Sequence, residues 1–438
     1  MSLPIPFPNL KFLPKLELSV PYFLFYTSLL CFTPIFVLVY VEVSSRRRQQ
    51  SAPRGCRKLG LRIRSNISDE YDSKYEEGVE QGQIADGTER WRVKSLWIYP
   101  VKSCKGVELN RGEVVSTGMR YDRQFSFAEL KKPTTTGDSQ KPEEQEEHWA
   151  FVTQRQLPLL ARVKTQIWVP DPDSPGYSTK SLDVQSGGVI IMTFPYKQPG
   201  WRGQLAGLAA PLIGEPEMSI KVPFDPTPEM ISRRGYTNEK MTIWKDAPYA
   251  LNMGSHLPPE LSSFLGVKRP FTLFKVDNHR EVYRCAPRKE QLGYQPITGF
   301  ADAYPLHILN LASVREVEKR ILSEPLRLTI ERFRANIIIT GPAAYTEETW
   351  KKILIGPYIY HVACRTARCM LPNVDPATGI KHASQPNKVL RSFRIVDDGA
   401  PNLACLGMQM VPGAEKSTIR VGDAIKVLET GEHFYIKQ

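Results

Sequence analysis

Apolar and polar residues alternate in short runs along most of the chain from Trp91 onward, and glycine, proline and aspartate separate these runs. An alternation with a period of two is typical of β-strands that bury one face. We therefore expect a mainly β fold with some helix, of the α+β class. The predicted strands cover residues 93–99, 112–117, 124–129, 148–153, 165–169, 189–194, 336–340 and 419–428. In the last range a Gly-Asp pair interrupts the alternation, which predicts either a bent barrel strand or a tight hairpin.

Two segments carry helix signals instead. Ser313 and Glu316 form a capping box, and apolar residues at helical spacing follow it. In the second segment, Thr346 is the expected N-cap and Gly356 the expected stop, with acidic residues in the first turn. The sequence shows no repeat with a period of about 20–50 residues, which argues against a solenoid or a propeller. We expect a few helices packed outside a β-rich body.

The N-terminal part of the chain has a different pattern. Residues 18–41 are uncharged and mostly apolar, and about 20 such residues span the hydrocarbon core of a bilayer. The run is longer than the apolar region of a cleaved signal peptide, and no A-x-A cleavage site follows it. The arginines at 46–48 come next, and by the positive-inside rule they keep the downstream chain in the cytosol. The sequence therefore predicts an N-terminal segment (1–17), a transmembrane signal anchor (18–43) and a cytosolic body.

Two further stretches have the composition of flexible chain. Residues 44–90 are polar and poor in large apolar side chains, with the basic residues first and the acidic residues after them. This pattern predicts a flexible basic/acidic tether. Residues 131–147 are of low complexity and lie between two predicted strands, which predicts a disordered surface loop.

The net charge of +12 raises the question of a nucleic-acid partner. Residues 44–65 are densely basic, whereas the excess over residues 91–438 is spread out, without a basic run or interleaved aromatic side chains. Spread positive charge is more typical of a solvated surface or of a pocket for an anionic ligand than of a duplex-binding face. We therefore expect no nucleic-acid partner.

The absence of several motifs narrows the chemistry. The seven cysteines include no C-x-x-C pair, which fits a reducing compartment better than secretion. The sequence contains no G-x-G-x-x-G after a strand, no P-loop motif and no H-E-x-x-H. It also lacks the cysteine spacing of ferredoxins, so no iron–sulfur cluster is expected. If the protein carries out redox chemistry, its electrons come from another protein.

Four segments place cationic and hydrogen-bonding side chains next to predicted strands. Taken singly, each residue has a structural interpretation, as a surface ion pair, a turn cap or an inert buried thiol. Taken together, they would form a suitable grip for an anionic ligand, and the cysteine would suit a soft metal. The candidate residues are Lys102, Ser103, Arg123, Arg334, Asn336, Arg368 and Cys369.

The sequence strings that hold these residues resemble the MOSC superfamily, and within it the mitochondrial amidoxime-reducing components. The strings YPVKSCKG, YDR, FRAN, RCMLPNVDPATG and IRVGDAIKVL occur in the order that the family has. The string around Cys369 is the most specific of them, and weaker matches lie at 153–158 and 302–305. The resemblance implies a MOSC β-barrel domain over residues 266–438. It also implies a MOSC N-terminal β-rich domain over residues 91–265.

The resemblance implies an enzyme that carries a molybdenum–molybdopterin cofactor. Cys369 matches the cysteine that binds molybdenum in the family. Tyr304 and Ala367 fall where the family has cofactor contacts, but their side chains differ, so only backbone contacts carry over. The other cofactor-binding residues that the resemblance implies are Lys102, Ser103, Arg123, Arg334, Asn336 and Arg368.

By the same resemblance, the enzyme is an oxidoreductase of the amidoxime-reductase type. It would reduce N-hydroxylated compounds, such as amidoximes and hydroxylamines, to amidines and amines by oxygen-atom transfer. The electrons would come from cytochrome b5 and NADH-cytochrome b5 reductase, and a shared membrane would raise the effective concentration of these partners. The expected location is the mitochondrial outer membrane, with the endoplasmic reticulum and the peroxisome as alternatives.

Two other functions stay open. MOSC domains also occur in molybdenum cofactor sulfurases, so a cofactor carrier without its own turnover is one alternative. The pyridoxal-phosphate-dependent desulfurase domain of those proteins is not expected, because the chain has no room for it. A membrane scaffold that has lost the cofactor is the other alternative, and the presence of Cys369 with its cationic set argues against it. The sequence departs from the family in the spacing from Cys364 to Cys369, which is longer than the usual Cys-x-Arg-Cys, and in the loop at 131–147.

Overall fold

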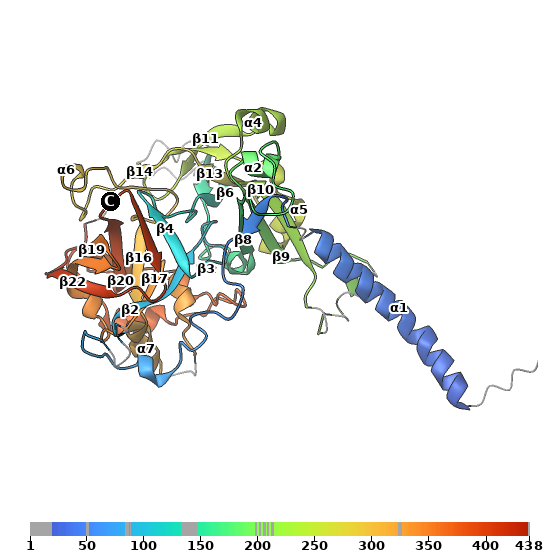
Figure 1. Ribbon diagram of the computed structural model, residues 1–438, viewed down its shortest axis with the longest axis horizontal. Coiled ribbons are helices and arrows are strands. Elements are labelled where there is room, and N and C mark those ends of the chain that lie inside the picture. The colour runs from blue at the N-terminus through green and yellow to red at the C-terminus, as the bar shows by residue number, and fades with distance from the viewer. Residues whose placement is uncertain are drawn as a thin grey trace, which may run out of the picture. The chain divides into compact units, whose positions relative to one another are not determined.

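The computed structural model describes residues 20–49, 52–83, 87, 89–132, 147–197, 199–200, 203–204, 207, 210–211, 214–322 and 326–436. The chain divides into two compact units. One consists of Met1–Ser51 and Lys197–Glu217, and the other of Ala52–Tyr196 and Met218–Gln438. Apart from helix α1, the elements discussed below belong to the second unit (Figure 1).

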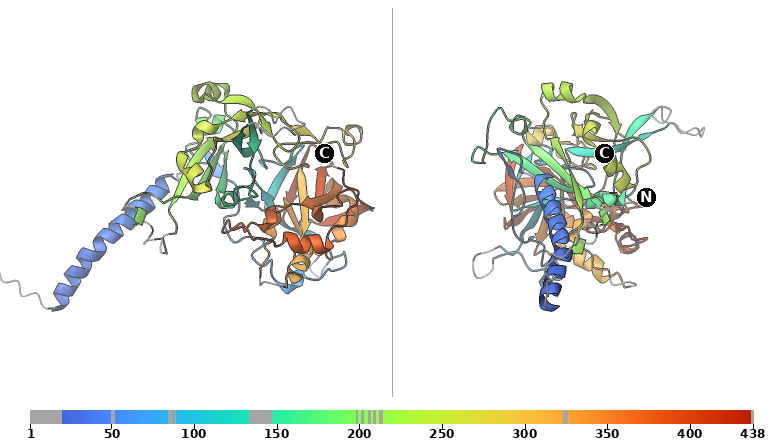
Figure 2. Two further views of the ribbon diagram at one scale, coloured as in Figure 1. Left: turned by 180° about the vertical axis from the view of Figure 1, so that it is seen from behind. Right: turned by 90° about the vertical axis from the view of Figure 1, so that its right-hand side faces the viewer.

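The largest sheet contains, in spatial order, β22 (Ile425–Thr430), β18 (Trp350–Ile355), β19 (Tyr358–Arg368), β20 (Ala404–Pro412), β16 (Leu306–Asn310), β17 (Ile337–Thr340), β2 (Arg92–Ile98) and β3 (Val107–Leu109). Its strands come from both the beginning and the end of the unit, since β2 pairs antiparallel with β17. Figure 2 shows the orange and red strands from the C-terminal part of this sheet in two further views. The parallel strands β16 and β17 are joined through α7 (Leu311–Lys319), which contacts both of them.

Both faces of β16 and β17 are covered, which explains why every residue of these two strands is buried. Ile337 and Ile339 pack into one hydrophobic cluster. Ile338, which points to the opposite face, packs into a second cluster together with Val314 and Val317 of α7. The apolar face of α7 therefore covers one side of the sheet, at the point where the loops before β17 and after β19 begin.

A closed barrel is formed by β6 (Phe125–Lys131), β7 (His148–Phe151), β11 (Thr237–Thr242), β12 (Tyr249–Asn252) and β13 (Phe271–Val276). Ala128, Met241 and Phe274 from three of these strands pack into one buried cluster. Phe127 stacks on Phe271, with 5.0 Å between the ring centroids. Most of the predicted disordered loop at 131–147 lies outside the described residues, between β6 and β7.

Three smaller sheets complete the second unit. One has the order β1 (Cys56–Lys58), β8 (Lys164–Pro170), β9 (Val189–Pro195) and β10 (Glu217–Pro223); another has β21 (Lys416–Arg420), β4 (Arg111–Val115) and β5 (Gly118–Met119); and the third pairs β14 (Arg280–Glu281) with β15 (Ile297–Thr298). Among the described residues, the short helices with defined bounds are α2 (Leu182–Gln185), α4 (Pro228–Arg234), α5 (Pro259–Leu265), α6 (Lys289–Leu292) and α8 (Asn387–Phe393).

The α+β class and the predicted strands are confirmed, since each predicted range overlaps a strand. The range 419–428 is divided between β21 and β22 around Gly422, whose φ is +92°. β21 pairs with β4, whereas β22 pairs with β18 in the largest sheet. The range thus holds two separate strands of different sheets, so neither the single bent strand nor the hairpin is confirmed.

The first predicted helix is confirmed as α7, but the predicted capping box is wrong. Asn310 is the N-cap, and its side chain accepts a hydrogen bond from the Ala312 N–H at 3.2 Å. Ser313 lies inside the helix, and its hydroxyl donates to the buried Glu347 carboxylate at 2.8 Å. The Ser313 hydroxyl, which the local pattern assigned to helix capping, thus forms a long-range hydrogen bond with Glu347 instead.

The second predicted helix is wrong. Its first residues form a single 3-10 turn, η6 (Thr346–Thr349), and β18 begins immediately afterwards. Trp350, Ile353 and Ile355 are buried and their strand pairs with both β19 and β22. The burial of this alternating apolar set in the sheet overrides the helix signals that flank it.

Part of the predicted tether at 44–90 is also wrong. β1 pairs antiparallel with β8, and Asp69 forms an ion pair with Lys94 at 2.8 Å. Glu70 is buried and accepts hydrogen bonds from the Thr329 hydroxyl at 2.6 Å and the Ile330 N–H at 2.8 Å. Residues 52–83 therefore form part of the second unit, because a few side chains have specific partners that the overall composition does not reveal.

The predicted membrane anchor is not supported. In the first unit, α1 (Val20–Gln49) is a continuous helix that contains Pro34. The hydroxyls of Thr27 and Thr33 donate to the carbonyls of Phe23 and Leu29, one turn earlier. When only the residues that the structure describes are considered, no helix is long and apolar enough to cross a membrane. The structure therefore does not support the transmembrane assignment of residues 18–43.

Candidate functional site

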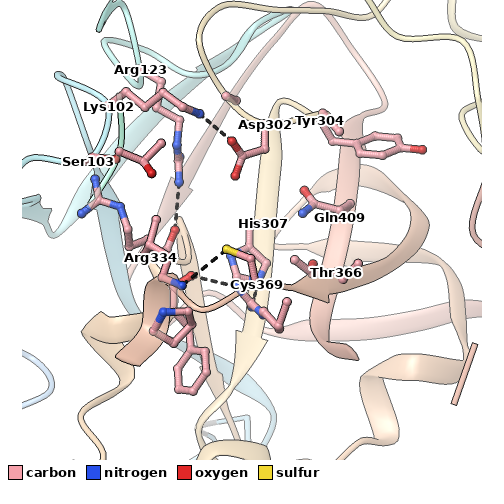
Figure 3. Close-up of a pocket in the computed structure, with 18 of the residues that line it drawn as sticks. Lys102, Ser103, Arg123, Asp302, Tyr304, His307, Arg334, Thr366, Cys369 and Gln409 are labelled. Carbon is pink, nitrogen blue, oxygen red and sulfur yellow. Dashed lines mark hydrogen bonds and ion pairs between the residues drawn. The ribbon is translucent and has the colours of Figure 1, made fainter. Parts of the chain in front are cut away.

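A cavity of about 150 Å³ lies near the ends of β2, β16, β17 and β19 (Figure 3). Every residue that was predicted for the site lines this cavity, although these residues come from segments far apart in the sequence. The set that the fold brings together is Lys102, Ser103, Arg123, Tyr304, Arg334, Asn336, Ala367, Arg368 and Cys369.

Lys102 contributes a buried ammonium group to one wall. Its backbone N–H donates to the Phe125 carbonyl at 2.7 Å, which fixes the segment after β2 against β6. Its Nζ donates to Asp302 Oδ1 at 2.5 Å and to the Phe300 carbonyl at 2.8 Å. Burial lowers the pKa of Lys102. Burial alone would raise the pKa of Asp302, but the ammonium holds it well below its ordinary value. Because the Asp302 side chain is 63% exposed, this ion pair links a buried proton donor to the cavity mouth.

Arg123 forms the adjoining wall. Its guanidinium is paired with the buried Asp122 carboxylate and donates to the Arg334 carbonyl at 3.0 Å. The guanidinium carbon also lies 5.0 Å from the centroid of the Tyr99 ring. Burial opposes the charged form, but the Asp122 carboxylate raises the pKa of Arg123. The cation is therefore held in a fixed position, with its charge only partly neutralised by one neighbour.

Asn336 connects three strands of the largest sheet. It is 1% exposed, and its Nδ2 donates to the Trp97 carbonyl of β2 at 3.1 Å. Its Oδ1 accepts hydrogen bonds from the His307 N–H of β16 at 3.2 Å and from Arg123 Nη1 at 3.4 Å. The amide thus fixes the positions of the groups around it, in addition to forming part of the cavity wall.

Arg334 is a partly buried cation with a buried, unused hydrogen-bond donor. It ends the 3-10 turn η5 (Ile330–Phe333), and its guanidinium carbon lies 4.1 Å from the centroid of the Tyr99 ring. Its Nη2 is buried and has no hydrogen-bond partner among the described residues. Burial lowers the pKa of Arg334 to about 10. A buried donor without a partner costs about 1–3 kcal/mol, so this atom indicates an acceptor that the protein itself does not supply.

Backbone strain is concentrated at the same cavity. In the described part of the chain, seven residues other than glycine have a positive φ, and four of them line the cavity. The four are Ser103 (φ +67°), Arg123 (+47°), Trp244 (+56°) and Arg334 (+53°). Such conformations cost on the order of 1–3 kcal/mol each, and they collect at ligand-binding and catalytic sites.

Arg368 holds the wall behind Cys369. Its Nε and Nη2 donate to the Leu406 carbonyl at 2.8 and 2.6 Å, and its Nη1 donates to the Phe333 carbonyl at 3.1 Å. Its Nη2 also lies 2.7 Å from His307 Nε2. A guanidinium only donates, so Nε2 is an acceptor and the imidazole is neutral. Burial and the Arg368 charge keep the pKa of His307 well below its ordinary value, which agrees with this assignment.

Cys369 directly follows β19, and its sulfur points toward the cavity centre in Figure 3. The thiol is partly exposed, and Sγ accepts a hydrogen bond from the Leu371 N–H at 3.4 Å. The segment after it is fastened by Arg332, which pairs with Asp375 at 2.6 Å. The sulfur is thus held in place by the backbone and stays open toward the cavity.

Tyr304 and Ala367 meet the cavity in a different way. The Tyr304 hydroxyl donates to the Arg284 carbonyl at 2.8 Å, and in Figure 3 the ring points away from Cys369. Ala367 pairs with Cys405 in the ladder between β19 and β20. The geometry therefore leaves mainly the backbone of these two residues for contacts with a ligand.

Trp244 lies at the rim and was missed in the sequence. It occupies the tight turn between β11 and β12, and its Nε1 donates to Asp302 at 3.3 Å. The Arg155 guanidinium carbon lies 4.8 Å from its ring centroid. Arg155 and Asp302 gave a weak signal as parts of the short matches at 153–158 and 302–305, whereas a tryptophan in a polar turn gives none. The other lining residues that were missed are Ala301, His307, Arg332, Arg365, Thr366, Gln409 and Tyr435.

The donor set fits a cofactor that brings its own metal ligands. Asp302 is the one carboxylate among the described residues that line the cavity, while lysine and arginine supply most of the charged groups. In the described ranges, no group of three or more His, Cys, Asp or Glu side chains could hold a metal ion. A soft metal bound at the Cys369 sulfur therefore needs further ligands from an organic, anionic group. The unused Nη2 of Arg334 is a donor for such a group.

Comparison with known proteins identifies the domains. The MOSC domain model matches residues 296–426, and the model of the MOSC N-terminal beta barrel domain matches residues 90–198. The boundaries at 91–265 and 266–438 stay predictions, because the matched ranges leave the segment between them unassigned. Trp244 lies in that segment.

Several curated relatives match along most of their length. Mitochondrial amidoxime reducing component 2 from Rattus norvegicus is 32% identical over 78% of this chain and 89% of its own. Mitochondrial amidoxime-reducing component 1 from Mus musculus is 25% identical over 79% of this chain and 89% of its own. Mitochondrial amidoxime reducing component 2 from Homo sapiens is 26% identical, with 78% and 89% covered. The chain therefore belongs to the family of MOSC-domain proteins that contains the mitochondrial amidoxime-reducing components.

Proposed function

We propose that this protein is a molybdenum cofactor-dependent oxidoreductase that reduces N-hydroxylated compounds, such as amidoximes and hydroxylamines. The observation that carries the proposal is a cysteine sulfur facing a cavity whose wall holds several cations, one of them with a buried, unused donor. The names of the relatives support a reduction of amidoximes. Family membership supports a function linked to the molybdenum cofactor.

Different residues would hold different parts of the cofactor. Cys369 would bind the metal through its sulfur. Ser103, Arg123 and Arg334 present donors and charge on one wall, suited to a phosphate and to the acceptors of a pterin. Lys102 adds a buried positive charge beside them. The residues proposed to act through the backbone or by positioning are Tyr304, Asn336, Ala367 and Arg368.

When bound, the cofactor would supply two-electron oxygen-atom transfer from the N-hydroxylated nitrogen. The protein's part is to orient the substrate and to exclude competing water. The exposed Asp302 carboxylate accepts hydrogen bonds, and the N–H groups of an amidoxime or an N-hydroxyguanidine are suitable donors to it. Trp244 offers a flat apolar face at the same rim. Lys102 holds a proton on Nζ, 2.5 Å from Asp302, within reach of the mouth.

The electron source is proposed to be external. Cytochrome b5 and NADH-cytochrome b5 reductase are the proposed donors, on the strength of the family resemblance and of the missing nucleotide-binding motifs in the sequence. The mitochondrion is the proposed location, since the names of the relatives give it.

Molybdenum analysis combined with a turnover assay tests the proposal. The full chain is purified from cells that make the cofactor, and benzamidoxime reduction is measured with NADH, cytochrome b5 and its reductase. We expect bound molybdenum and turnover. Molybdenum without turnover of any N-hydroxylated compound would instead identify a carrier, and protein that never binds molybdenum would identify a scaffold.

A further inference from the structure

Cys285 and Cys364 lie together outside the cavity, and the proposed function uses neither of them. They pack in one small cluster with Tyr304, Val411 and Tyr435. The Cys364 thiol is hydrogen-bonded to the Cys285 sulfur. Both thiols are free, Cys364 being fully buried and Cys285 partly exposed. The pair therefore consists of a solvent-accessible thiol, Cys285, and a buried thiol, Cys364, that packs beside it.

Local backbone irregularities bring the two sulfurs together. In the ladder between β19 and β20, Val362 pairs with Met410 and Cys364 pairs with Gln409, so β19 holds one extra residue at position 363. A β-bulge of this kind turns the next side chain away from its regular direction. Cys285 itself has a φ of +53°, in a region that non-glycine residues rarely occupy. The bulge directly before Cys364 thus coincides with the packing of this thiol in the same cluster as Cys285.

The surroundings of Cys285 favour its reaction with an electrophile. In its protonated form, the thiol donates to the Phe434 carbonyl at 3.4 Å. Hydrogen bonds from the Cys364 thiol and the Ile436 N–H favour the anion and, against the effect of burial, lower the pKa of Cys285 to about 6. The Cys285 hydrogen bond and burial raise the pKa of Cys364 well above its ordinary value. A reactive thiolate beside a protonated thiol is the arrangement of an attacking and a resolving cysteine.

We propose that Cys285 and Cys364 are a redox-active pair that forms a reversible disulfide in the presence of a hydroperoxide. The Cys285 thiolate attacks the terminal peroxide oxygen, the O–O bond breaks, and the leaving oxygen is protonated to water or an alcohol. The Cys364 sulfur then attacks the Cys285 sulfenic acid, an S–S bond forms, and the hydroxyl leaves as water with the Cys364 proton. Two thiols lose two electrons in total, which reduce one peroxide, and a dithiol reverses the reaction.

The pair is next to the cavity wall. Tyr304 and Tyr435 pack in the same cluster as the two cysteines, and both tyrosines also line the cavity. Disulfide formation removes the thiol proton between the sulfurs and draws them into covalent contact, so both tyrosines must adjust. This modification site does not depend on the molybdenum cofactor, and its test is independent of the proposed function.

Peptide mapping of the full chain tests the proposal directly. The reduced protein is treated with hydrogen peroxide at neutral pH, remaining thiols are alkylated, and the protein is digested with trypsin without reductant. Cleavage after the neighbouring lysine and arginine residues gives the peptides CAPR (285–288) and ILIGPYIYHVACR (353–365). We expect these two peptides to be linked after peroxide treatment and to separate after treatment with dithiothreitol.

Matched variants complete the experiment. Cys285→Ser and Cys364→Ser should each abolish the linked peptide, and Cys364→Ser should allow Cys285 to oxidise further to the sulfinic acid. Cys405→Ser, which removes another buried thiol, should leave the linkage unchanged. In the unaltered protein, the rate of alkylation at Cys285 should follow a titration centred near pH 6. The proposal is overturned if peroxide takes Cys285 to sulfinic acid in the unaltered protein, or links it to a cysteine other than Cys364.

Discussion

Arg334 and Arg394 both stack on a tyrosine ring, but their surroundings differ. The guanidinium carbon of Arg334 lies 4.1 Å from the Tyr99 centroid, and that of Arg394 lies 4.0 Å from the Tyr345 centroid. Arg394 is paired with the buried Glu348 carboxylate. In the part of the chain that the structure describes, Arg334 has no ion-pair partner and leaves Nη2 unused. Burial and charge alone therefore do not distinguish a ligand site from a structural cluster; an unused donor on a strained backbone does.

The largest expected effect is at Arg394, the arginine that has an ion-pair partner. Arg394→Ala leaves the Glu348 carboxylate buried with only the weaker Arg365 contact at 3.4 Å. Removing one partner of a buried ion pair costs about 3–5 kcal/mol, and we expect a loss of this size in the free energy of unfolding. Urea denaturation measures it, with the matched variant Arg391→Ala, which removes an exposed arginine from α8, the helix that ends just before Arg394. Equal stability of the two variants would contradict the structural role of Arg394.

The free energy of unfolding is expected to depend on pH through Glu347, the neighbour of Glu348 in the sequence. Burial raises the pKa of Glu347 to about 7, so the folded state binds the proton more tightly than the unfolded state. The free energy of unfolding should therefore fall by about 1.4 kcal/mol per pH unit as the pH rises from about 4.5 to 7. Glu347→Gln should flatten this part of the profile, as determined by denaturation at several pH values. An unchanged slope in the variant would show that another group titrates there.

At Arg334, whose Nη2 has no partner among the described residues, the substitution Arg334→Ala should affect ligand binding more than folding. The substitution removes a buried donor without a partner, so the free energy of unfolding of the cofactor-free protein should stay within about 1 kcal/mol. Molybdenum content should fall, because a charge-assisted contact contributes about 1.5–3 kcal/mol, which is roughly 10- to 100-fold in affinity. Elemental analysis measures the content, with Arg334→Lys as the partial rescue. Full molybdenum loading in Arg334→Ala would contradict the proposed role of Arg334 in binding the cofactor.

The smallest effect is expected at the rim. Trp244 is 43% exposed, and its replacement by alanine removes an aromatic face without opening the core. We expect the KM for benzamidoxime to rise a few-fold, since one stacking contact contributes about 0.5–1.5 kcal/mol. Trp244→Phe should restore most of the affinity, and the KM for hydroxylamine, which has no ring, should not change. A loss of kcat alone for both compounds would exclude a substrate-binding role.

The same comparison shows how far the sequence could be interpreted. The strands could be predicted because their apolar positions alternate, and the site residues could be named because short specific strings carry them. The difference between Arg334 and Arg394 could not be predicted, because it depends on an ion pair between Arg394 and Glu348, which are 46 residues apart in the sequence. The local signals around Thr346 and Gly356 predicted a helix there. Burial of Trp350 in the sheet, a long-range contact, decided otherwise.

Residues 52–83 and Trp244 likewise could not be placed from the sequence. Residues 52–83 have the composition of a tether, yet Glu70 and Asp69 find partners far along the chain. Trp244 reaches the cavity through the turn between β11 and β12, and no periodicity or motif marks it. In each case, the position of a side chain depends on strand pairing across long sequence separations, which a local pattern does not contain.

X-ray absorption at the molybdenum edge tests the central assignment most directly. The full chain and Cys369→Ser are purified from cells that make the cofactor, and the sulfur neighbours of the metal are counted alongside benzamidoxime turnover. We predict that the variant keeps its fold, loses one sulfur neighbour and loses turnover. An unchanged sulfur shell together with unchanged turnover in Cys369→Ser would contradict the assignment of this thiol as the metal ligand.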